Sequence, residues 1–286
     1  MLATSTSPLR LSARERLATA RAPGVIDARA IPGTAEAIKI DGDLSERSWD
    51  DAVPVHDFRQ REPVEGADAT LDTEVRVLFD ATSLYVAVRA HDPEPSRIVG
   101  LLTRRDDESP SDWVSVLIDS YHDRRTAYEF GVNPTGVKFD TYWYNDTNND
   151  RGWDAVWDVA VTRDATGWRA EFRIPFSQLR FKNGTADGLG FAVVRRVPHA
   201  NETSTWPLLA RSASGFVSSF GELRGVTVSD NQKKLELMPY VLAEATTAPV
   251  QAGNPLVASP DGSAAVGIDL KYRVLSGLTL TGMLNP

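Results

Sequence analysis

Residues 73–79 read Thr-Glu-Val-Arg-Val-Leu-Phe, and residues 84–90 read Leu-Tyr-Val-Ala-Val-Arg-Ala. In the first run, Val75, Val77 and Phe79 alternate with Glu74 and Arg76, and Leu84, Val86 and Val88 alternate in the second run. A period of two is typical of a strand with one buried face. The segment between the runs, Asp80–Ser83, contains turn formers. The stretch therefore predicts a β-hairpin.

Further alternating runs follow the hairpin along the chain. Turn formers separate them, as in the segments Asn133–Gly136 and Asp164–Gly167. Many short strands with tight turns and almost no helix predict an all-β fold, an antiparallel β-sandwich. The one short helix expected is Leu44–Ala52, because Asp43 and Glu46 have the spacing of a capping pair. The further strands are predicted at Trp113–Asp119, Arg125–Asn133, Val137–Trp143, Trp157–Arg163, Trp168–Ile174 and Leu189–Arg196.

The composition limits the classes of partner. The chain has 286 residues, of which 42% are hydrophobic, enough for one large domain and a smaller remainder. A formal net charge of −8 excludes nucleic acid as the expected partner, because affinity for phosphate backbones depends on cationic side chains. The absence of cysteine excludes disulfides, thiolate metal ligands and cysteine nucleophiles. No apolar run reaches about 18 residues, so a transmembrane helix is not expected.

The two ends of the chain differ from its centre. Residues 1–37 carry scattered arginines among Ala, Ser, Thr and Pro, and lack the apolar core of about 7–15 residues that a signal peptide needs, so we predict a disordered leader. Residues 266–274 alternate apolar and polar side chains over about nine positions, the length of a strand that crosses a bilayer. Extra strands of a soluble sheet have the same pattern, so the alternation alone leaves both alternatives open.

Five blocks of sequence, in order along the chain, resemble carbohydrate-binding module family 9. The blocks are Ile40–Trp49 with Leu84–Pro93, Ser111–Asp119, Phe130–Pro134, Gly167–Phe176 and Phe220–Leu223. The resemblance implies a β-sandwich over residues 38–226 that binds an oligosaccharide or polysaccharide and serves carbohydrate catabolism without catalysis. Proteins that resemble both halves of the chain carry an outer-membrane β-barrel after the sandwich. Residues 227–286 are therefore expected to be the first strands of an incomplete membrane-type barrel, and the location to be the periplasm and outer membrane.

Two other functions stay open at this stage. The sandwich would act as a structural plug or docking domain of a transporter-like barrel if it binds no sugar. Similar sandwiches bind haem, but the methionines available as axial ligands, Met1, Met238 and Met283, all lie outside the predicted sandwich. The sequence contains neither Gly-x-Ser-x-Gly nor His-Glu-x-x-His. The resemblance links the family to O-glycosyl hydrolase systems, and we expect a binding domain rather than the hydrolase.

The resemblance also implies where a sugar would bind. In sugar-binding members of the family, two tryptophans sandwich the ligand, and the corresponding positions in this chain are Glu108 and Ser214. The family's polar contacts to sugar, near the positions of Ser115, Gly131 and Val194, are likewise not reproduced. A glycan site in this chain must therefore be built from other residues.

Three of the seven tryptophans are the aromatic candidates for that site. Trp143 and Trp206 adjoin polar loops, and Trp113 begins a strand. Sugar rings present C–H faces that pack on flat aromatic surfaces, so these three are predicted platforms. Trp157 and Trp168 are in phase with apolar alternation, and we predict that both belong to the core.

Three charged residues are the polar candidates. Arg105, Arg196 and Glu202 lie in clusters of mixed sign, and their planar groups suit sugar hydroxyls or the carboxylate of a uronic acid. Clusters of this kind also occur as paired charges that lock loops together.

A metal site is the remaining candidate. Asp146, Asn148 and Asp150 occupy alternate positions, as the oxygen ligands of calcium loops do, so a structural calcium ion is predicted there. The glycine falls one place late, at Gly152, and an Asx-rich turn is the alternative interpretation.

Overall fold

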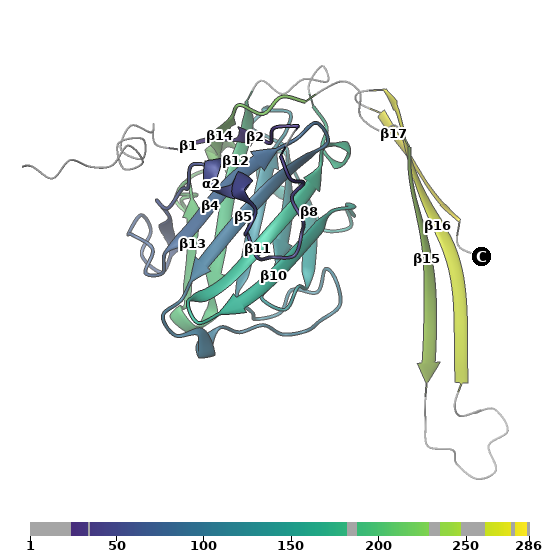
Figure 1. Ribbon diagram of the computed structural model, residues 1–286, viewed down its shortest axis with the longest axis horizontal. Helices are drawn as coiled ribbons and strands as arrows, with labels where there is room; N and C mark the ends of the chain where they lie inside the picture. The colour runs from purple at the N-terminus through teal and green to yellow at the C-terminus, as the bar shows by residue number, and fades with distance from the viewer. Residues whose placement is uncertain are drawn as a thin grey trace, which may run out of the picture. The chain divides into compact units, whose positions relative to one another are not determined.

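The computed structural model describes residues 24–33, 35–181, 188–228, 235–246, 261–275 and 278–284. The chain divides into two compact units, Met1–Asp230 and Asn231–Pro286. The first unit is a β-sandwich, and the strands of its smaller sheet cross in front of those of its larger sheet in Figure 1. The predicted fold class, an all-β antiparallel β-sandwich, is confirmed.

The larger sheet has nine strands, in the order β1-β14-β12-β6-β7-β8-β9, with β13 beside β12 and β3 beside β13. All of its pairs are antiparallel except β1 with β14. The bounds are β1 Val25–Asp27, β3 Arg59–Glu62, β6 Trp113–Asp119, β7 Ala127–Val132, β8 Lys138–Tyr144, β9 Asn148–Asp150, β12 Leu189–Val197, β13 Glu202–Trp206 and β14 Gly221–Arg224.

The smaller sheet has five strands, in the order β10-β11-β5-β4-β2. The predicted hairpin is its centre, where Val77 pairs with Val86 in antiparallel register. The bounds are β2 Arg29–Ala30, β4 Thr73–Phe79, β5 Ser83–His91, β10 Asp158–Asp164 and β11 Gly167–Pro175. Short 3-10 helices lie in the connections: η1 Pro95–Arg97, η2 Phe176–Gln178, η4 Pro198–Ala200 and η5 Val217–Ser219.

The core fills the space between the sheets with one set of alternating side chains from each. Trp157 and Trp168 are 1% and 2% exposed, which confirms their prediction as core residues. Trp157 stacks on Phe172 at 5.8 Å between ring centroids and meets Phe130 edge-on at 5.3 Å. The alternation seen in the sequence is therefore the pattern that buries one face of each strand.

The outer face of the smaller sheet is covered by the helix α2 (Arg47–Asp51) and the segment that precedes it. Trp49 of α2 is buried there, and its indole N–H donates to Glu171 Oε1 at 3.1 Å. The helix begins later than predicted. Glu46 occupies the N-cap position, but its side chain makes no hydrogen bond to the first turn of the helix. Its Oε1 instead accepts a hydrogen bond from Lys39 N at 3.0 Å.

The outer face of the larger sheet is covered only in part. The connection from β13 to β14 folds over it, and Leu209, Val217 and Phe220 pack against Leu117 and Ala192 of the sheet. The neighbouring rows of that face carry polar and aromatic side chains.

The N-terminal leader was predicted too long. Within the predicted disordered segment 1–37, residues 25–30 form β1 and β2, which pair with β14 and β4. Ile26 is fully buried in the core. A strand of only two or three residues gives no alternation to detect, which explains the error. Residues 1–23 lie outside the described residues.

The second unit contains a three-stranded antiparallel sheet, β15 (Leu235–Thr246), β16 (Asp261–Leu275) and β17 (Leu278–Leu284). Its register aligns apolar residues with apolar residues, for example Leu237 with Leu270 and Tyr272 with Leu280. Because alternate residues share a face, one face of this sheet is apolar. The exposed apolar side chains on it include Leu235, Leu237, Val241, Val266, Leu270, Tyr272, Leu280 and Leu284.

No helix within the described segments has the length and apolar character needed to cross a membrane.

The core arrangement predicts the cost of removing one ring. Phe130→Ala should lower the free energy of unfolding by about 3–5 kcal/mol, because Phe130 is fully buried and its loss leaves a cavity beside Trp157. Leu102→Ala, a control at a residue that is 84% exposed, should change it by no more than about 0.5 kcal/mol. Urea unfolding of the two variants measures both values, and a loss below about 1 kcal/mol at Phe130 would contradict this packing.

Candidate functional site

A groove follows the outer face of the larger sheet, where the β13–β14 connection leaves it uncovered. It consists of two adjoining hollows with volumes of about 250 Å³ and 280 Å³. Glu62, Thr203 and Arg196 line both hollows, and they form one cross-strand row of β3, β13 and β12. We call the two hollows together the open-face groove. Its other lining residues are Arg61, Glu129, Trp143, Val194, Thr205, Leu209 and Phe216 in the first hollow and Ser109–Ser111, Trp113, Val197, Pro198, Asn201 and Glu202 in the second.

An aromatic pair forms one wall of the first hollow. Trp143, at the end of β8, and Phe216, in the β13–β14 connection, have ring centroids 4.3 Å apart, tilted by 38°. Both side chains are only partly buried. A partly exposed pair of rings offers the kind of apolar surface on which the C–H face of a sugar packs.

A buried acid lies behind this wall. Glu129 of β7 is 6% exposed and accepts a hydrogen bond from the Trp143 indole N–H at 2.8 Å. Burial raises the pKa of the Glu129 carboxyl above its ordinary value of 4.5, although the hydrogen bond from Trp143 and the positive charge of Arg196 act in the opposite direction. The bond fixes the orientation of the indole ring at the groove.

Two guanidinium groups border the groove. Arg61 donates through Nη1 to the Leu209 carbonyl at 2.6 Å, and its guanidinium carbon lies 5.9 Å from the centroid of the Phe216 ring. Arg196 has an Nη1 that lies 3.4 Å from Oε2 of Glu108. Each arginine therefore has a defined position and further donors to offer to a ligand.

Four of the predicted site residues line the groove: Trp143, Trp113, Arg196 and Glu202. Trp113 is only 2% exposed, and its indole N–H donates to the Ser109 carbonyl at 2.9 Å, so it contributes an edge and not an open platform. Glu202 is 4% exposed and accepts hydrogen bonds from Thr70 N at 3.2 Å and Thr70 Oγ1 at 2.7 Å. Among these four, Trp143 and Arg196 have accessible side chains.

Two predicted site residues do not line the groove. Trp206 is 3% exposed in the core, near Phe191, because its position on β13 faces the smaller sheet. Its prediction as a platform was wrong. Arg105 instead donates to the buried Asp140 and to the Ala155 carbonyl, and it locks two loops together as a paired charge.

The predicted calcium loop is not formed as a loop. Asn148 and Asp150 belong to strand β9, which pairs with Tyr144 and Tyr142 of β8. Asp146 accepts hydrogen bonds from Phe216 N at 3.0 Å and Ser218 N at 2.9 Å, and such bonds lower the pKa of its carboxyl. This carboxylate anchors the β13–β14 connection beside the groove, and extended backbone at residues 148–150 does not wrap around a cation.

Of the positions implied by the family resemblance, Val194 lines the first hollow of the groove, and the others do not line it. Ser115 pairs across strands with both Gly131 and Val194, so the three lie in one row of the outer face. Glu108 contacts Arg196, and Ser214 precedes Phe216 in the connection that forms the wall.

Several lining residues escaped the sequence analysis. Arg61, Thr203 and Thr205 lie on β3 and β13, short strands without a strong alternation. Glu129 had a detectable signal, since a glutamate within the apolar run Ala127–Val132 breaks its pattern. Phe216 had none, because it reaches the groove through the fold of a long connection.

The fold and groove define a β-sandwich domain with a potential ligand site on the outer face of one sheet. The family model described as "Carbohydrate family 9 binding domain-like" matches residues 40–206, more than half of the chain. The chain therefore belongs to the carbohydrate family 9 binding domain-like family. No curated protein matches it.

Solved structures are similar at low identity. A family 9 carbohydrate-binding module from Caldicellulosiruptor kristjanssonii, in complex with cellotriose, is 20% identical with a TM-score of 0.48, over 72% of this chain and 96% of that one. A module of this family from the same organism in complex with glucose is 18% identical with a TM-score of 0.49, over 72% and 98%. A protein from Bacteroides uniformis, whose assignment as carbohydrate-binding is provisional, is 11% identical with a TM-score of 0.51, over 73% and 100%. The similarity to the Bacteroides uniformis structure agrees with the β-sandwich fold of this chain.

The buried acid predicts a pH dependence of stability. Because the pKa of Glu129 is higher in the folded protein than its ordinary value of 4.5, the folded state holds this proton more tightly. The contribution is fully present below pH 4.5 and is lost as the pH rises through the folded-state pKa. The unfolding free energy of the wild type should therefore fall relative to that of Glu129→Gln as the pH is raised above 4.5.

Urea unfolding of both proteins at several pH values measures this difference. Thr203→Ser, which changes a groove residue that does not titrate, is the control and should differ from the wild type by an amount independent of pH. If the unfolding free energy of the wild type rises, or stays constant, relative to that of Glu129→Gln as the pH increases above 4.5, the assignment is contradicted.

Proposed function

We propose that the first unit binds a short oligosaccharide in the open-face groove, without catalysing its conversion. The observation that carries the proposal is the partly exposed Trp143–Phe216 pair, bordered by the guanidinium groups of Arg61 and Arg196. An apolar surface beside planar donors is the combination that sugar rings and their hydroxyls require. Membership of the carbohydrate family 9 binding domain-like family supports it.

The groove suggests how the contacts are divided. A sugar ring would pack on the Trp143–Phe216 pair, while its hydroxyls accept from Arg196 and donate to Glu62 and Thr203, which line both hollows. The combined size of the hollows falls within the range of about 300–1,000 Å³ common for small-ligand sites, which suits a short oligosaccharide. Arginine next to this wall also suits a carboxylate-bearing sugar.

The experiment is a titration of the protein with cellotriose, glucose and an oligogalacturonate, followed by tryptophan fluorescence and calorimetry. Trp143→Ala should weaken the binding of whichever sugar binds the wild type by about tenfold or more, because truncating a central aromatic anchor costs about 2 kcal/mol. Tyr144→Ala is the control, since Tyr144 is the next residue of β8 and faces away from the groove. Equal affinity of the two variants, or no binding of any of the three sugars, would overturn the proposal.

We also propose that the second unit belongs to an outer-membrane barrel that presents the sandwich in the periplasm. The supporting observation is the two-faced sheet: Leu237, Leu270 and Leu280 lie on its apolar face, whereas Asp269 and Thr281 lie on the other. Strands of membrane barrels alternate in this way, with apolar residues toward lipid.

The proposed membrane insertion is tested by placing an arginine on one face or the other of the three-stranded sheet. In cells that express the protein, Leu270→Arg should reduce its recovery in the outer-membrane fraction, because an arginine facing lipid costs about 2–4 kcal/mol near the bilayer centre. Thr281→Arg, on the opposite face, should leave recovery close to that of the wild type. Equal recovery of the two variants, or recovery of the wild type only in the soluble fraction, would contradict membrane insertion.

A further inference from the structure

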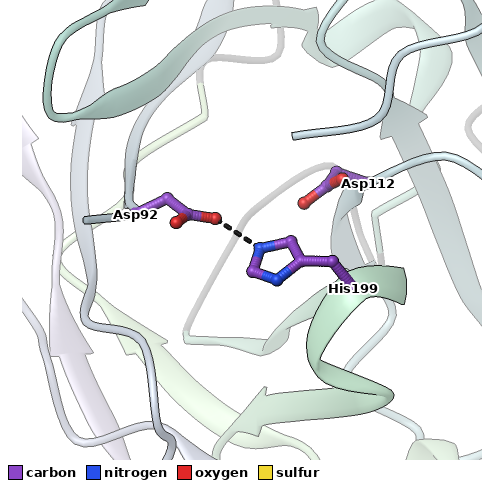
Figure 2. Close-up of side chains that lie close together, drawn as sticks. All are labelled: Asp92, Asp112 and His199. Atoms are coloured by element: carbon purple, nitrogen blue, oxygen red, sulfur yellow. Dashed lines mark hydrogen bonds and ion pairs between the residues drawn. The ribbon is translucent and has the colours of Figure 1, made fainter. Parts of the chain in front are cut away.

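A buried polar cluster is formed by three residues that do not themselves line the groove. Asp92 directly follows β5, Asp112 directly precedes β6, and His199 lies in η4. Figure 2 shows the carboxylate of Asp92 bonded to the His199 imidazole and the carboxylate of Asp112 directed toward the same ring. One donor atom from each residue lies within 4.8 Å of the others.

The cluster is removed from solvent. Asp92 and Asp112 are each 1% exposed, and the His199 side chain is 11% exposed. Asp92 Oδ2 lies 2.6 Å from His199 Nε2, and Asp92 Oδ1 accepts from Glu94 N at 2.8 Å. Asp112 Oδ2 accepts from Val99 N at 2.8 Å. Two buried carboxylates within reach of one imidazole are costly unless their oxygens are satisfied.

One of these oxygens is not satisfied. Asp112 Oδ1 is inaccessible and has no hydrogen-bond partner among the described residues. The backbone bond to Oδ2 holds the carboxylate so that Oδ1 is free for a ligand within the cluster. A buried acceptor without a donor costs about 1–3 kcal/mol, and a cation bound at this point would remove that cost.

Arg195 supplies part of the positive charge nearby. Its guanidinium donates to the Asp72 carbonyl at 2.8 Å, Thr73 Oγ1 at 3.0 Å and the His91 carbonyl at 2.8 Å. None of these bonds goes to Asp92 or Asp112, although the charge of Arg195 acts on both carboxylates. The cluster therefore places two buried carboxyl groups near a single guanidinium that donates a hydrogen bond to neither of them.

We propose that Asp92, Asp112 and His199 form a binding site for a divalent transition-metal ion of the zinc type. Imidazole nitrogen together with carboxylate oxygen is a donor set that Zn²⁺ binds, whereas Ca²⁺ and Mg²⁺ prefer oxygen ligands alone. Zinc lies about 2.0–2.2 Å from such donors, which places neighbouring donors about 3.4 Å apart in a tetrahedral site. The Asp92–His199 pair, 2.6 Å apart, must therefore open, and the three donor atoms, now within 4.8 Å of one another, must adopt this spacing by side-chain rotation.

The metal would connect three separate parts of the sandwich. It would join the end of β5, the start of β6 and η4, of which the first and the last already meet through the Asp92–His199 contact. Asn201 and Glu202, which follow η4, line the second hollow of the groove. Metal binding would therefore fix the position of Asn201 and Glu202 at one rim of the groove. Only this effect on the groove rests on the proposed function; the metal site itself does not.

The site is tested with zinc alone, in the absence of any sugar. Calorimetric titration of the chelator-treated protein with ZnCl₂ should give one ion per chain and a higher melting temperature, and excess CaCl₂ should not compete. Asp112→Asn should weaken zinc at least tenfold, and its amide oxygen still accepts the bond from Val99 N, so folding is retained. His199→Gln should weaken zinc by a similar factor.

His56→Gln is the matched control, because His56 also contacts an acid, Asp72, but lies exposed at the surface. It should bind zinc as the wild type does. If His56→Gln loses zinc while His199→Gln keeps it, the ion is bound at the surface and the proposal is overturned. Absence of saturable binding up to about 1 mM zinc overturns it as well.

Spectra of the wild type decide the question without any substitution. The chain has four histidines, and in protein labelled with ¹⁵N-histidine, zinc should shift the imidazole nitrogens of His199 and leave the other three unchanged. Shifts confined to other histidines would contradict the site. These readouts are independent of sugar binding, so a failure here and a failure of the groove are distinguishable.

Discussion

The hydrogen bond from the Trp143 indole to the buried Glu129 carboxyl is the interaction on which the groove depends. Each sheet of a sandwich can turn only one face toward the core, and the other face must be covered or left to contact a ligand. On the smaller sheet, α2 and Trp49 cover that face. On the larger sheet, the β13–β14 connection covers only part, and the Trp143–Glu129 bond fixes the aromatic ring at the margin of what remains.

The same connection links stability to the proposed function. Asp146 anchors it through the amides of residues 216 and 218, and this places Phe216 against Trp143. The wall of the groove is therefore built by a loop that also closes a small apolar cluster with Leu117. Packing energy keeps the aromatic pair in place, so the wall of the groove is formed without a ligand.

Alternation in the sequence was sufficient to predict the sandwich, because Val75, Val77 and their equivalents follow the period that burial imposes. It did not predict the site. Trp143 and Trp206 both lie close to a polar loop in the sequence. The position of Trp206 on β13, however, directs its side chain into the core. Phe216 and Arg61 come together only through the β13–β14 connection and the added strand β3, which no local pattern reveals. The Asp92–Asp112–His199 cluster is likewise assembled from three distant segments.

The most direct test of the central claim is the resonance of the Trp143 indole N–H during titration with an oligosaccharide that binds the protein. This proton is bonded to Glu129, so a ligand on the ring must alter its environment. The account predicts that the Trp143 indole signal shifts in proportion to binding, while the indole signals of the core residues Trp157 and Trp168 stay fixed. Saturable sugar binding that leaves the Trp143 signal unchanged would place the ligand elsewhere and contradict the account.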